Sequence, residues 1–569
     1  MSVPDTAAAP DDTGSPPPRA RRTRTLLGAA GLIAGLTVVA RVVGFGRIFV
    51  FAGAVGVTSI GNIYQAVNTI PNIVFEIVAG GALAAVVVPL LAGAADRGDR
   101  ATVDRITSAL LTWVILLLVP LAVVVALAAG PIVAGLLGPD ASAADGAFGR
   151  LLLRVFAPQL VLYGVGVVLT GVLQAHRRFA GPALAPLLSS VTVIGAYLVY
   201  GWTEGGADSV SDVGPAGQLV LAVGTTLGVV VLSLSLLVPL RGTGVRIRPT
   251  LRFPPGVVGQ ARRMVGSGVA TVLGQQVALL VALVLTQESW SAPVGSLVVF
   301  TLAQTVFLLP WAVFAVPLAT SAYPRLASAW EGSDRDGYRD TLRTTLHGTL
   351  VLCALATAAL IAGAGPIAAI VTAANGDAAR SAVTTGIVFF APGLLGYGLF
   401  ALLSRALYAA GRPGPVAAAV LGGWAVTAVA DVVLAVTLPA EHRVAALAAG
   451  NTIGMTVLGA ALLVLTARTA GTGAFRGLGR LFTALAPATG IAAAAGAGVA
   501  SVLPGDGVLA ALGAGGVTAI AVVGLFLAVL RPVGRLVGAE TGVPLRRPRR
   551  VVSDRPGMLD PIVDEGEKA

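Results

Sequence analysis

The sequence has little charge for its length. Only 11% of its 569 residues are Asp, Glu, Lys or Arg, whereas 56% are hydrophobic. A soluble protein covers its surface with charged residues at roughly a quarter of its positions. The composition therefore excludes a soluble globular protein and predicts that most of the surface faces lipid.

Cysteine and histidine are also scarce. The one cysteine, Cys353, lies inside an apolar run, which excludes a disulfide framework and a cysteine-based zinc site. The three histidines, His176, His347 and His442, share no ligand spacing. The residues therefore indicate neither a metal nor another cofactor. On a soluble protein, the net charge of +11 would suggest binding to nucleic acid. In a membrane protein the positions of the basic residues are more informative than their sum, and no nucleic-acid partner is expected.

Apolar runs long enough to span a bilayer fill the chain from residue 26 onward. Several exceed the minimum length, so tilted or proline-kinked helices are expected. The sequence predicts an all-α polytopic membrane protein with fourteen spans: 26–53, 62–92, 106–133, 147–174, 181–201, 215–240, 258–286, 293–320, 342–372, 380–410, 415–438, 443–467, 478–503 and 507–530.

The basic residues test this count, because cytoplasmic segments of membrane proteins are enriched in Lys and Arg. With alternating sides, 31 of the 38 basic residues fall on the side of the N-terminus. The outer side has only Arg150, Arg154, Arg380 and Arg443. The pattern predicts a multi-pass protein of the plasma (inner) membrane with both termini cytoplasmic. A signal peptide at the basic N-terminus is disfavoured, because the first apolar run is long and leads into another.

The chain repeats itself at a fixed offset. Ala157-Pro158-x-Leu160-x-x-Tyr163-Gly164 recurs 234 residues later as Ala391-Pro392-x-Leu394-x-x-Tyr397-Gly398. The offset covers six spans, so it predicts two parallel six-helix lobes, an arrangement that places a transporter's site between them. We expect a disordered tail at 1–24, an N-lobe at 25–240, a basic linker at 241–257, a C-lobe at 258–470, two extra helices at 471–530 and a disordered tail at 531–569.

Two arginines lie within the first span. Arg41 and Arg47 are about 9 Å apart along a helix and about 120° apart around it, so both could border one aqueous cavity. Buried charge is costly in a bilayer and calls for a reason. Guanidinium groups bind phosphates in a bidentate manner, which favours a pyrophosphate site. Snorkelling, or a buried pair with an acid, is the competing interpretation.

Polar residues line one face of the second span. Gln65, Asn68, Asn72 and Glu76 step by three, four and four residues, and Asn62 precedes them. This stripe favours a water-filled cavity over helix–helix hydrogen bonding. Glu76 is expected to pair with Arg41 or Arg47 in the absence of substrate. Pro71 should kink this helix, and Gly80 and Gly81 should form a hinge.

The second half carries fewer polar residues in its spans. Gln275, Gln276, Gln304 and Thr305 could complete the cavity from the C-lobe, although polar packing explains each one alone. Asp431, with Thr427 one turn earlier, is a candidate site for a coupling cation or proton. An ion pair between Asp431 and Arg405 explains that aspartate equally well.

Two stretches carry a resemblance to a known family. They are Arg41-Val-Val-Gly44-Phe45-Gly-Arg47, Ile70-Pro71-Asn72, Gly80-Gly81-Ala82 and Val88-Pro89-Leu90-Leu91 in the first, and Leu173-Gln-Ala175-His176-Arg177-Arg178-Phe179 with Pro182-Ala-Leu-Ala-Pro186 in the second. These stretches resemble the MurJ/MviN family, the lipid II flippases of the multidrug/oligosaccharidyl-lipid/polysaccharide exporter superfamily.

The resemblance implies an alternating-access carrier. It implies a cationic central cavity lined by spans 1, 2, 7 and 8, and a lipid-tail groove formed by spans 13 and 14. The family's two arginines of span 1 match Arg41 and Arg47. The family's acid before span 2 is Asn62 here, its span-2 arginine falls near Phe75, and its span-8 arginine falls near Thr305. The cavity is thus less cationic than the family pattern.

The function expected from the resemblance is movement of lipid II from the inner to the outer leaflet for peptidoglycan synthesis, without enzymatic chemistry. A cation gradient or the membrane potential would reset the carrier, and proteins of cell-wall synthesis or division are expected partners beside membrane lipids. Another polyprenyl-pyrophosphate glycolipid, or export of a drug, remains an alternative. A membrane glycosyltransferase is disfavoured because the outer loops are short and lack convincing paired carboxylates, and a non-transporting scaffold does not explain the polar stripe.

Overall fold

The computed structural model describes residues 18–77, 84–254, 272–503 and 507–536, and every regular element in these ranges is a helix. The first group of helices is α1 (Pro18–Ala54), α2 (Ser59–Phe75), α3 (Ala84–Asp96), α4 (Arg100–Leu127), α5 (Ala129–Leu137), α6 (Ala143–Phe156), α7 (Gln159–Ala175), α8 (Ala180–Glu204), α9 (Pro215–Leu234) and α10 (Leu237–Arg241).

The second group begins with the short apolar helix Val272–Leu285. It continues with α12 (Ser296–Pro310), α13 (Val316–Glu331), α14 (Arg335–Val371), α15 (Gly376–Phe390), α16 (Gly393–Ala409), α17 (Pro413–Thr437) and α18 (Arg443–Ala470). The last two helices are α19 (Leu478–Val502) and α20 (Val508–Leu536). The all-α, polytopic architecture predicted from composition is confirmed.

Polar residues begin several of these helices. Asp99 caps α4 by accepting a hydrogen bond from the Thr102 amide at 3.1 Å. Hydrogen bonding from the side chain and then the amide of Thr102 holds the pKa of the Asp99 carboxyl below its usual range. Ser142 and Asp145 form a reciprocal capping box at the start of α6. Such caps satisfy amide groups that a helix leaves unbonded in its first turn. They mark where the chain leaves one apolar run and turns into the next.

Eleven helices among the described residues are long and apolar enough to cross a membrane, or twelve if the bent pair α15–α16 forms one span. Two of the fourteen expected spans fall where the description is interrupted. Span 62–92 corresponds to α2 and α3 on either side of residues 78–83, and span 258–286 is described only from Val272. The count of fourteen therefore stays a prediction.

The predicted tails need a correction at their inner ends. Helix α1 begins at Pro18, inside the segment 1–24 predicted to be disordered, and α20 continues to Leu536, beyond the predicted end of the last span. Proline suits the first turn of a helix, and the arginine-rich segment after Pro18 contains good helix formers, so charge alone does not end the helix. Residues 1–17 and 537–569 lie outside the described residues.

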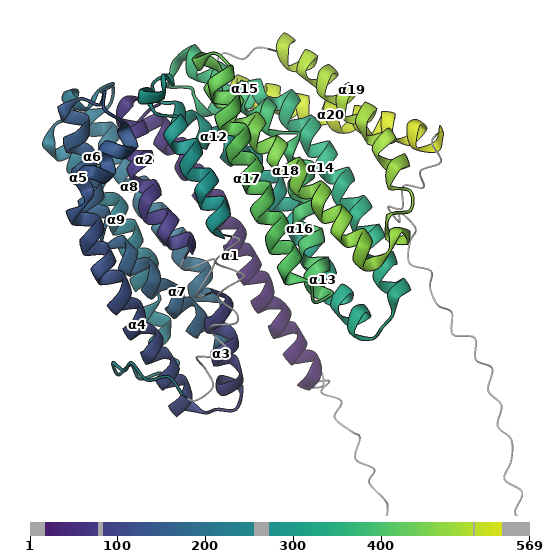
Figure 1. Ribbon diagram of the computed structural model, residues 1–569, viewed down its shortest axis with the longest axis horizontal. Helices are drawn as coiled ribbons and strands as arrows, with labels where there is room; N and C mark the ends of the chain where they lie inside the picture. Colours follow the sequence, from purple (N-terminus) through teal and green to yellow (C-terminus); the bar gives the residue numbers. More distant parts are fainter. Residues whose placement is uncertain (1–17, 78–83, 255–271, 504–506, 537–569) are drawn as a thin grey trace, which may run out of the picture.

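The helices pack into two bundles, which we call the N-lobe (α1–α10) and the C-lobe (Val272–Leu285 to α18). In the N-lobe α1 packs along α8, α8 along α9 and α4 along α7, and in the C-lobe α18 packs along both α17 and α16. Helices α19 and α20 pack against each other and against α14, on the side away from the N-lobe (Figure 1). Helix α1 runs between the two bundles (Figure 1).

The lobes touch at one end, along a line that we call the seam. The Asn62 side chain of α2 donates to Gln287 Oε1 at 3.3 Å and accepts from the Leu297 amide at 2.9 Å. The Asn375 side chain accepts from the Val57 amide at 2.6 Å and donates to the Ala52 carbonyl at 2.9 Å. Four hydrogen bonds between uncharged groups thus join the lobes, which diverge towards the other end (Figure 1).

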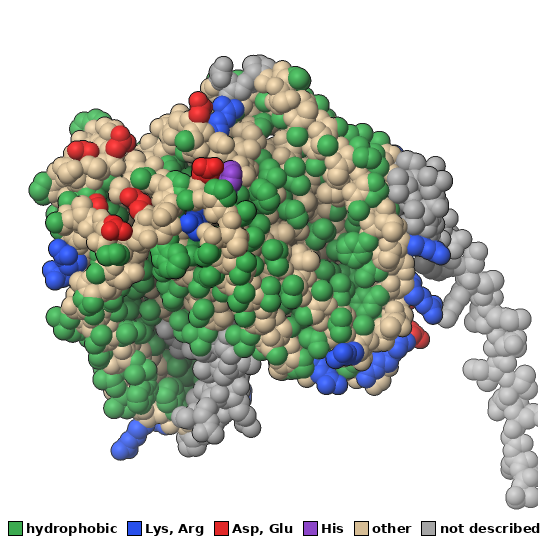
Figure 2. All heavy atoms as spheres, turned by 45° about the horizontal axis from the view of Figure 1, so that its top comes forward, with side chains coloured by type: hydrophobic (Ala, Val, Ile, Leu, Met, Phe, Trp, Pro, Cys, Tyr) green, Lys and Arg blue, Asp and Glu red, His purple; other side chains and the backbone are tan. Residues whose placement is uncertain are grey.

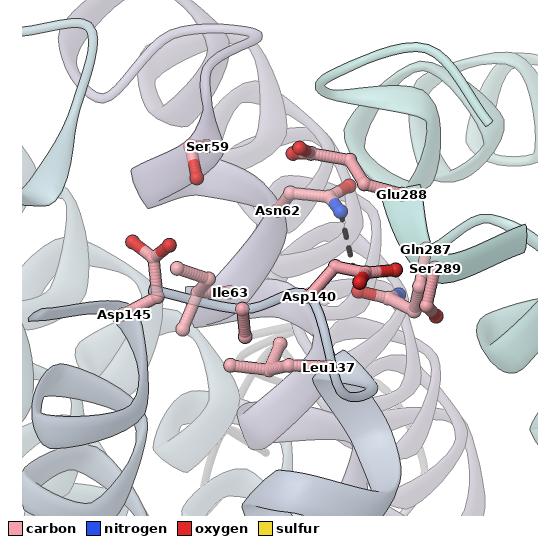
Figure 3. Close-up of a pocket in the computed structure, with 10 residues that line it drawn as sticks. Ser59, Asn62, Ile63, Leu137, Asp140, Asp145, Gln287, Glu288 and Ser289 are labelled. Atoms are coloured by element: carbon pink, nitrogen blue, oxygen red, sulfur yellow. Dashed lines mark hydrogen bonds between the residues drawn. The ribbon is translucent and has the colours of Figure 1, made fainter. Parts of the chain in front are cut away.

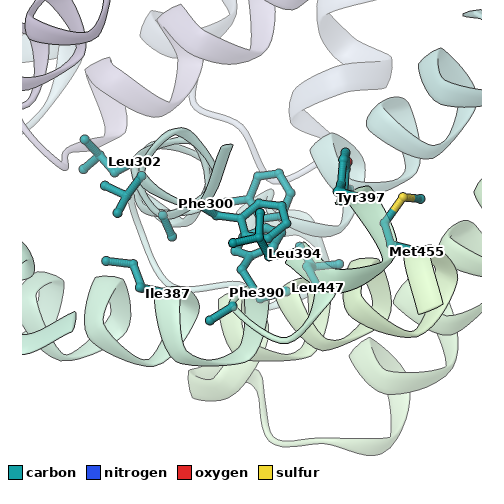
Figure 4. Close-up of a cluster of buried hydrophobic side chains, with 14 of the residues drawn as sticks. Phe300, Leu302, Ile387, Phe390, Leu394, Tyr397, Leu447 and Met455 are labelled. Carbon is teal, nitrogen blue, oxygen red and sulfur yellow. The ribbon is translucent and has the colours of Figure 1, made fainter. Parts of the chain in front are cut away.

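Aromatic and aliphatic side chains fill the core of the C-lobe (Figure 4). Phe307 stacks on Phe390 with ring centroids 5.2 Å apart, and Tyr397 meets Phe307 edge-on. The helices α16 and α18 approach closely because a side chain is missing at Gly396, where a Cβ atom would lie 2.2 Å from the Met455 carbonyl oxygen. This packing fixes the C-lobe helices that carry its polar residues.

Charge is distributed unevenly over the ends of the molecule. Figure 2 shows acidic side chains gathered at the end where the lobes meet, above a broad hydrophobic belt, with arginines prevailing at the opposite end. The belt includes large exposed apolar residues of many helices, among them Leu117, Leu198, Val429 and Ile520. A belt of this kind is the surface expected to face the hydrocarbon of a bilayer.

Candidate functional site

Arg41 lies in the half of α1 that leads to the seam. It is exposed and lines a cleft of about 430 Å³, together with Gln174 of α7 and Phe179, Pro182 and Pro186 at the start of α8. The cleft is therefore bordered by a guanidinium group and an amide over an apolar floor. Among the described residues no carboxylate forms an ion pair with Arg41.

Arg47 is half-buried, six residues closer to the seam. Its charge acts on the hydroxyl groups of Tyr163 and Tyr197, which lie on α7 and α8. Tyr197 in turn contacts the hydroxyl of Tyr64 at 2.8 Å, and Tyr64 contacts Thr225 Oγ1 at 2.6 Å. Arg47 thus faces a polar network instead of an acid, since in the described part of the chain it too lacks a carboxylate partner. The expected ion pair with Glu76 is not formed by either arginine.

The stripe on α2 continues this polar region. The Asn72 side chain accepts a hydrogen bond from the Tyr163 hydroxyl at 3.2 Å, which links α2 to the arginine-facing tyrosines. Gln65 and Asn68 are half-buried, and Glu76 is exposed. The stripe is therefore joined to Tyr163, one of the tyrosines on which the charge of Arg47 acts. Asn62, at the start of the stripe, is bound into the seam instead.

The predicted hinge is described only in part. Pro71 is buried within α2, which continues past it to Phe75. Gly80 and Gly81 lie outside the described residues. Whether this segment acts as a hinge therefore stays a prediction.

A second polar region is a cavity of about 240 Å³ in the C-lobe. Gln304 of α12, with Thr427 and Asp431 of α17, reaches this cavity from separate parts of the sequence. Its other lining residues with a polar group are Gln275, Trp311, Tyr397, Trp424 and Asn451. Four of the predicted residues, Gln275, Gln304, Thr427 and Asp431, thus converge on one cavity. Gln276 is buried elsewhere with an unbonded Oε1, and the Thr305 hydroxyl donates to the Thr301 carbonyl.

Asp431 is 2% exposed, and its Oδ1 has no hydrogen-bond partner. The Oδ1 of Asn451, on the neighbouring helix α18, is buried and unbonded in the same way. Arg405 donates to the Ala401 carbonyl instead of pairing with Asp431. Two glycines bring the helices this close, because a Cβ at Gly450 would lie 2.0 Å from Asp431 Oδ1, and one at Gly454 would lie 1.9 Å from Thr427 Oγ1. Among the described residues, the cavity therefore presents oxygen atoms that no basic side chain neutralises.

A small pocket of about 70 Å³ opens beside the seam (Figure 3). The carboxylates of Asp140 and Asp145 approach it from the N-lobe, and that of Glu288 approaches from the C-lobe (Figure 3). Burial, followed by the proximity of Asp145, raises the pKa of Glu288. Like charges therefore face each other across the lobe boundary, next to the Asn62–Gln287 hydrogen bond.

Several of these residues were not found from the sequence. Gln287 and Asn375 join the lobes across more than 200 positions of sequence, and Tyr64, Tyr163, Tyr197 and Asn451 are neutral polar residues inside apolar runs. Tyr163 and Tyr397 occupy matching positions of the internal repeat. This match in the repeat is the signal that could have indicated a role for Tyr163 and Tyr397.

Comparison with known proteins bears on this arrangement. The family model described as lipid II flippase MurJ matches residues 51–516. The chain belongs to the MurJ family. A probable lipid II flippase MurJ of Synechocystis sp. is 30% identical over 244 residues, which are 42% of this chain and 45% of the relative. A lipid II flippase MurJ of Burkholderia cenocepacia is 29% identical over 168 residues, 29% of this chain and 32% of the relative. The matched parts thus span less than half of these curated MurJ proteins.

Solved structures of similar fold extend the comparison. A lipid II flippase MurJ in an inward closed conformation has a TM-score of 0.64 and 16% identity, covering 89% of this chain and 99% of that one. An inward-facing multidrug resistance MATE family transporter of the MOP superfamily has a TM-score of 0.61 and 12% identity, covering 75% and 95%. At these identities the likeness concerns the fold alone. It agrees with the resemblance seen in the sequence.

Proposed function

We propose that this chain moves lipid II, or a similar polyprenyl-pyrophosphate glycolipid, from the inner to the outer leaflet of the plasma membrane by alternating access. The observation that carries the proposal is the pair Arg41 and Arg47. Both lie on the helix between the lobes of a MurJ-family protein, and no described carboxylate neutralises either one. A pyrophosphate is the kind of group that two unpaired guanidinium groups bind well.

In this mechanism the seam is the outer closure, and the arginine-rich end faces the cytoplasm. The headgroup enters between the lobes from the cytoplasmic side and reaches Arg41 first, then Arg47 and the tyrosines beside it. The polyprenyl tail stays in the bilayer along α19 and α20. Rocking of the lobes then breaks the seam and exposes the headgroup on the outer side.

The test is conditional depletion of the protein with leaflet-resolved labelling of lipid II. Wild type should restore outward movement, Arg41→Ala and Arg47→Ala should restore little, and Arg41→Lys should restore part because it keeps the charge. Arg154→Ala is the matched control, because Arg154 is an exposed arginine of α6 outside the site. Full activity of the Arg41→Ala and Arg47→Ala variants would refute the proposal.

The second candidate is another substrate of the same superfamily. The likeness to MATE transporters favours this alternative at the level of fold. The depletion experiment separates the two, because the lipid-linked intermediate that accumulates on the cytoplasmic side identifies the substrate. Accumulation of a different oligosaccharide lipid, with normal lipid II distribution, would replace lipid II in the proposal. Undisturbed growth and lipid distribution would favour a scaffold.

Transport is driven in this proposal by a cation at the C-lobe cavity. Asp431, Thr427 and Asn451 offer a carboxylate, a hydroxyl and an amide oxygen, the kind of ligand atom that hard cations prefer. Asp431 Oδ1 and Asn451 Oδ1 are buried without a hydrogen-bond partner. Asp431→Asn should remove the cation dependence of transport in proteoliposomes, whereas Asp377→Asn, at an exposed outer residue, should not. If Asp431→Asn leaves that dependence unchanged, the cation binds elsewhere. A dependence on membrane potential alone would also overturn this step.

A further inference from the structure

The segment that follows α10 is hydrogen-bonded to the surface of α4. The amides of Arg246, Arg248 and Thr250 donate to three side chains of α4, at 3.0, 2.9 and 3.1 Å. The acceptors are Asp104, Ser108 and Thr112, which step by four residues and so share one face of the helix. The Trp113 indole then donates to the Leu251 carbonyl at 3.1 Å. We call residues 245–252 the strap.

The strap alternates basic and apolar residues. Arg246, Arg248 and Arg252 are exposed, and between them Ile247 and Leu251 are 45% and 52% exposed. Because every second amide bonds to α4, the chain is held extended, and Pro249 favours this conformation for the residue before it. The strap therefore holds the backbone of its arginines in place and exposes two large apolar side chains beside them. Exposed apolar side chains are unfavourable in a segment that contacts only water.

The position of the strap along α4 indicates what it contacts. The polar acceptors end at Thr112, and the exposed apolar surface of α4 begins at Trp113 and continues with Ile115, Leu116 and Leu117. The strap thus ends where the lipid-facing surface begins. Tryptophan is typical of this level, the boundary between hydrocarbon and headgroups. The strap arginines accordingly lie at headgroup depth.

The carboxylates nearest the strap make contacts other than ion pairs with its arginines. Asp104 is engaged by the Arg246 amide, Asp96 pairs with Arg177, and Asp99 caps α4. Arg97, Arg100 and Arg105 add positive charge at the same end of α4. Within the ranges that the structure describes, none of the three strap arginines forms an ion pair. They are therefore available to an anionic ligand.

We propose that the strap binds the phosphate headgroups of anionic phospholipids in the cytoplasmic leaflet. The guanidinium groups contact phosphate oxygens, and Ile247 and Leu251 enter the acyl boundary. The placement in the cytoplasmic leaflet rests on the orientation in the proposed function. The bonds to α4 position the arginines before lipid arrives, so that little ordering accompanies binding. This lipid differs from the transported one, because the strap lies on the outer face of α4, away from α1.

The test measures binding of phosphatidylglycerol and phosphatidylcholine to the full-length protein in neutral detergent by native mass spectrometry. The strap variant Arg246→Gln/Arg248→Gln/Arg252→Gln should lose phosphatidylglycerol affinity. A basic residue near an anionic surface contributes roughly fivefold, so three contribute up to about a hundredfold. Affinity for phosphatidylcholine should not change. The matched control is Arg412→Gln/Arg476→Gln/Arg480→Gln, three exposed arginines of the C-terminal half, which should change either affinity less than about twofold.

A second variant tests the positioning. Ser108→Ala/Thr112→Val removes two acceptors and keeps every arginine, so it should increase hydrogen exchange at residues 246–250 and weaken phosphatidylglycerol binding severalfold. Wild-type affinity in the strap variant, or an equal loss in the control, would overturn the proposal. The proposal would also be overturned if the protein bound polyglutamate through the strap but did not distinguish phosphatidylglycerol from phosphatidylcholine. That result would favour an acidic protein as the partner of the strap. The binding assay contains no transported lipid, so Arg41→Ala should bind phosphatidylglycerol as wild type does. Failure of the strap proposal is therefore distinguishable from failure of the flippase proposal.

Discussion

Removing the two asparagines of the seam should open the end at which the lobes meet. Asn62 and Asn375 together make four hydrogen bonds across the lobe boundary. A typical bond contributes about 1 kcal/mol net, so each Asn→Ala substitution should destabilise the closed seam by about 2 kcal/mol. That shifts the ratio of closed to open molecules roughly thirtyfold. In the Asn62→Ala/Asn375→Ala variant, the ratio of closed to open molecules should fall by about a thousandfold if the two effects add.

These values are lower limits for Asn62, because its substitution leaves Gln287 Oε1 and the Leu297 amide unbonded in a buried place. An unbonded buried group costs about 1–3 kcal/mol. In the open state water hydrates the same groups, so the penalty falls on the closed state alone. The substitution therefore changes the conformational equilibrium more than the stability of either lobe.

The assay is a distance measurement between spin labels at Ser211 and Ala378, two exposed residues on opposite lobes. Cys353 is 2% exposed, so it is shielded from the label. The double variant should populate a longer distance. Gln218→Ala is the control, because the Gln218 side chain bonds to the Val213 carbonyl within the N-lobe. If the double variant keeps the wild-type distances, the asparagines do not hold the lobes together and the reasoning is refuted.

Two further predictions concern the seam pocket and the C-lobe core. Burial, followed by the proximity of Asp145, raises the pKa of Glu288 when the seam is closed. The protonated form is therefore favoured in the closed state, and closure should weaken as pH rises through that pKa. Glu288→Gln should remove this pH dependence of the spin-label distances, and an unchanged dependence would assign it to another group. Gly396→Ala should destabilise the protein by about 2–3 kcal/mol, because backbone of α18 occupies the space of the new methyl group. Gly422→Ala, which meets open space, should be neutral or slightly stabilising in thermal unfolding, and equal melting temperatures for both would contradict the packing argument.

The sequence predicted the fold class well, because a bilayer demands long apolar helices. The orientation predicted from the arginine distribution stays a prediction. It also singled out Asp431 and Arg47, because charge is rare in such helices. It did not predict the seam. The hydrogen bond between Asn62 and Gln287 joins residues 225 positions apart. The sequence around either residue contains no feature that indicates the other as its partner. Neutral residues such as Asn451 were missed because amides in apolar helices usually serve packing.

The bonds of the seam join amides and carbonyls, none of which carries a formal charge. Dissolved ions screen the attraction between full charges much more than hydrogen bonds between neutral groups. If the strap binds anionic lipid as proposed, a rise in ionic strength weakens that binding, whereas the hydrogen bonds of the seam are little affected. The lipid contact and the contact between the lobes would then respond differently to the same change in ionic strength.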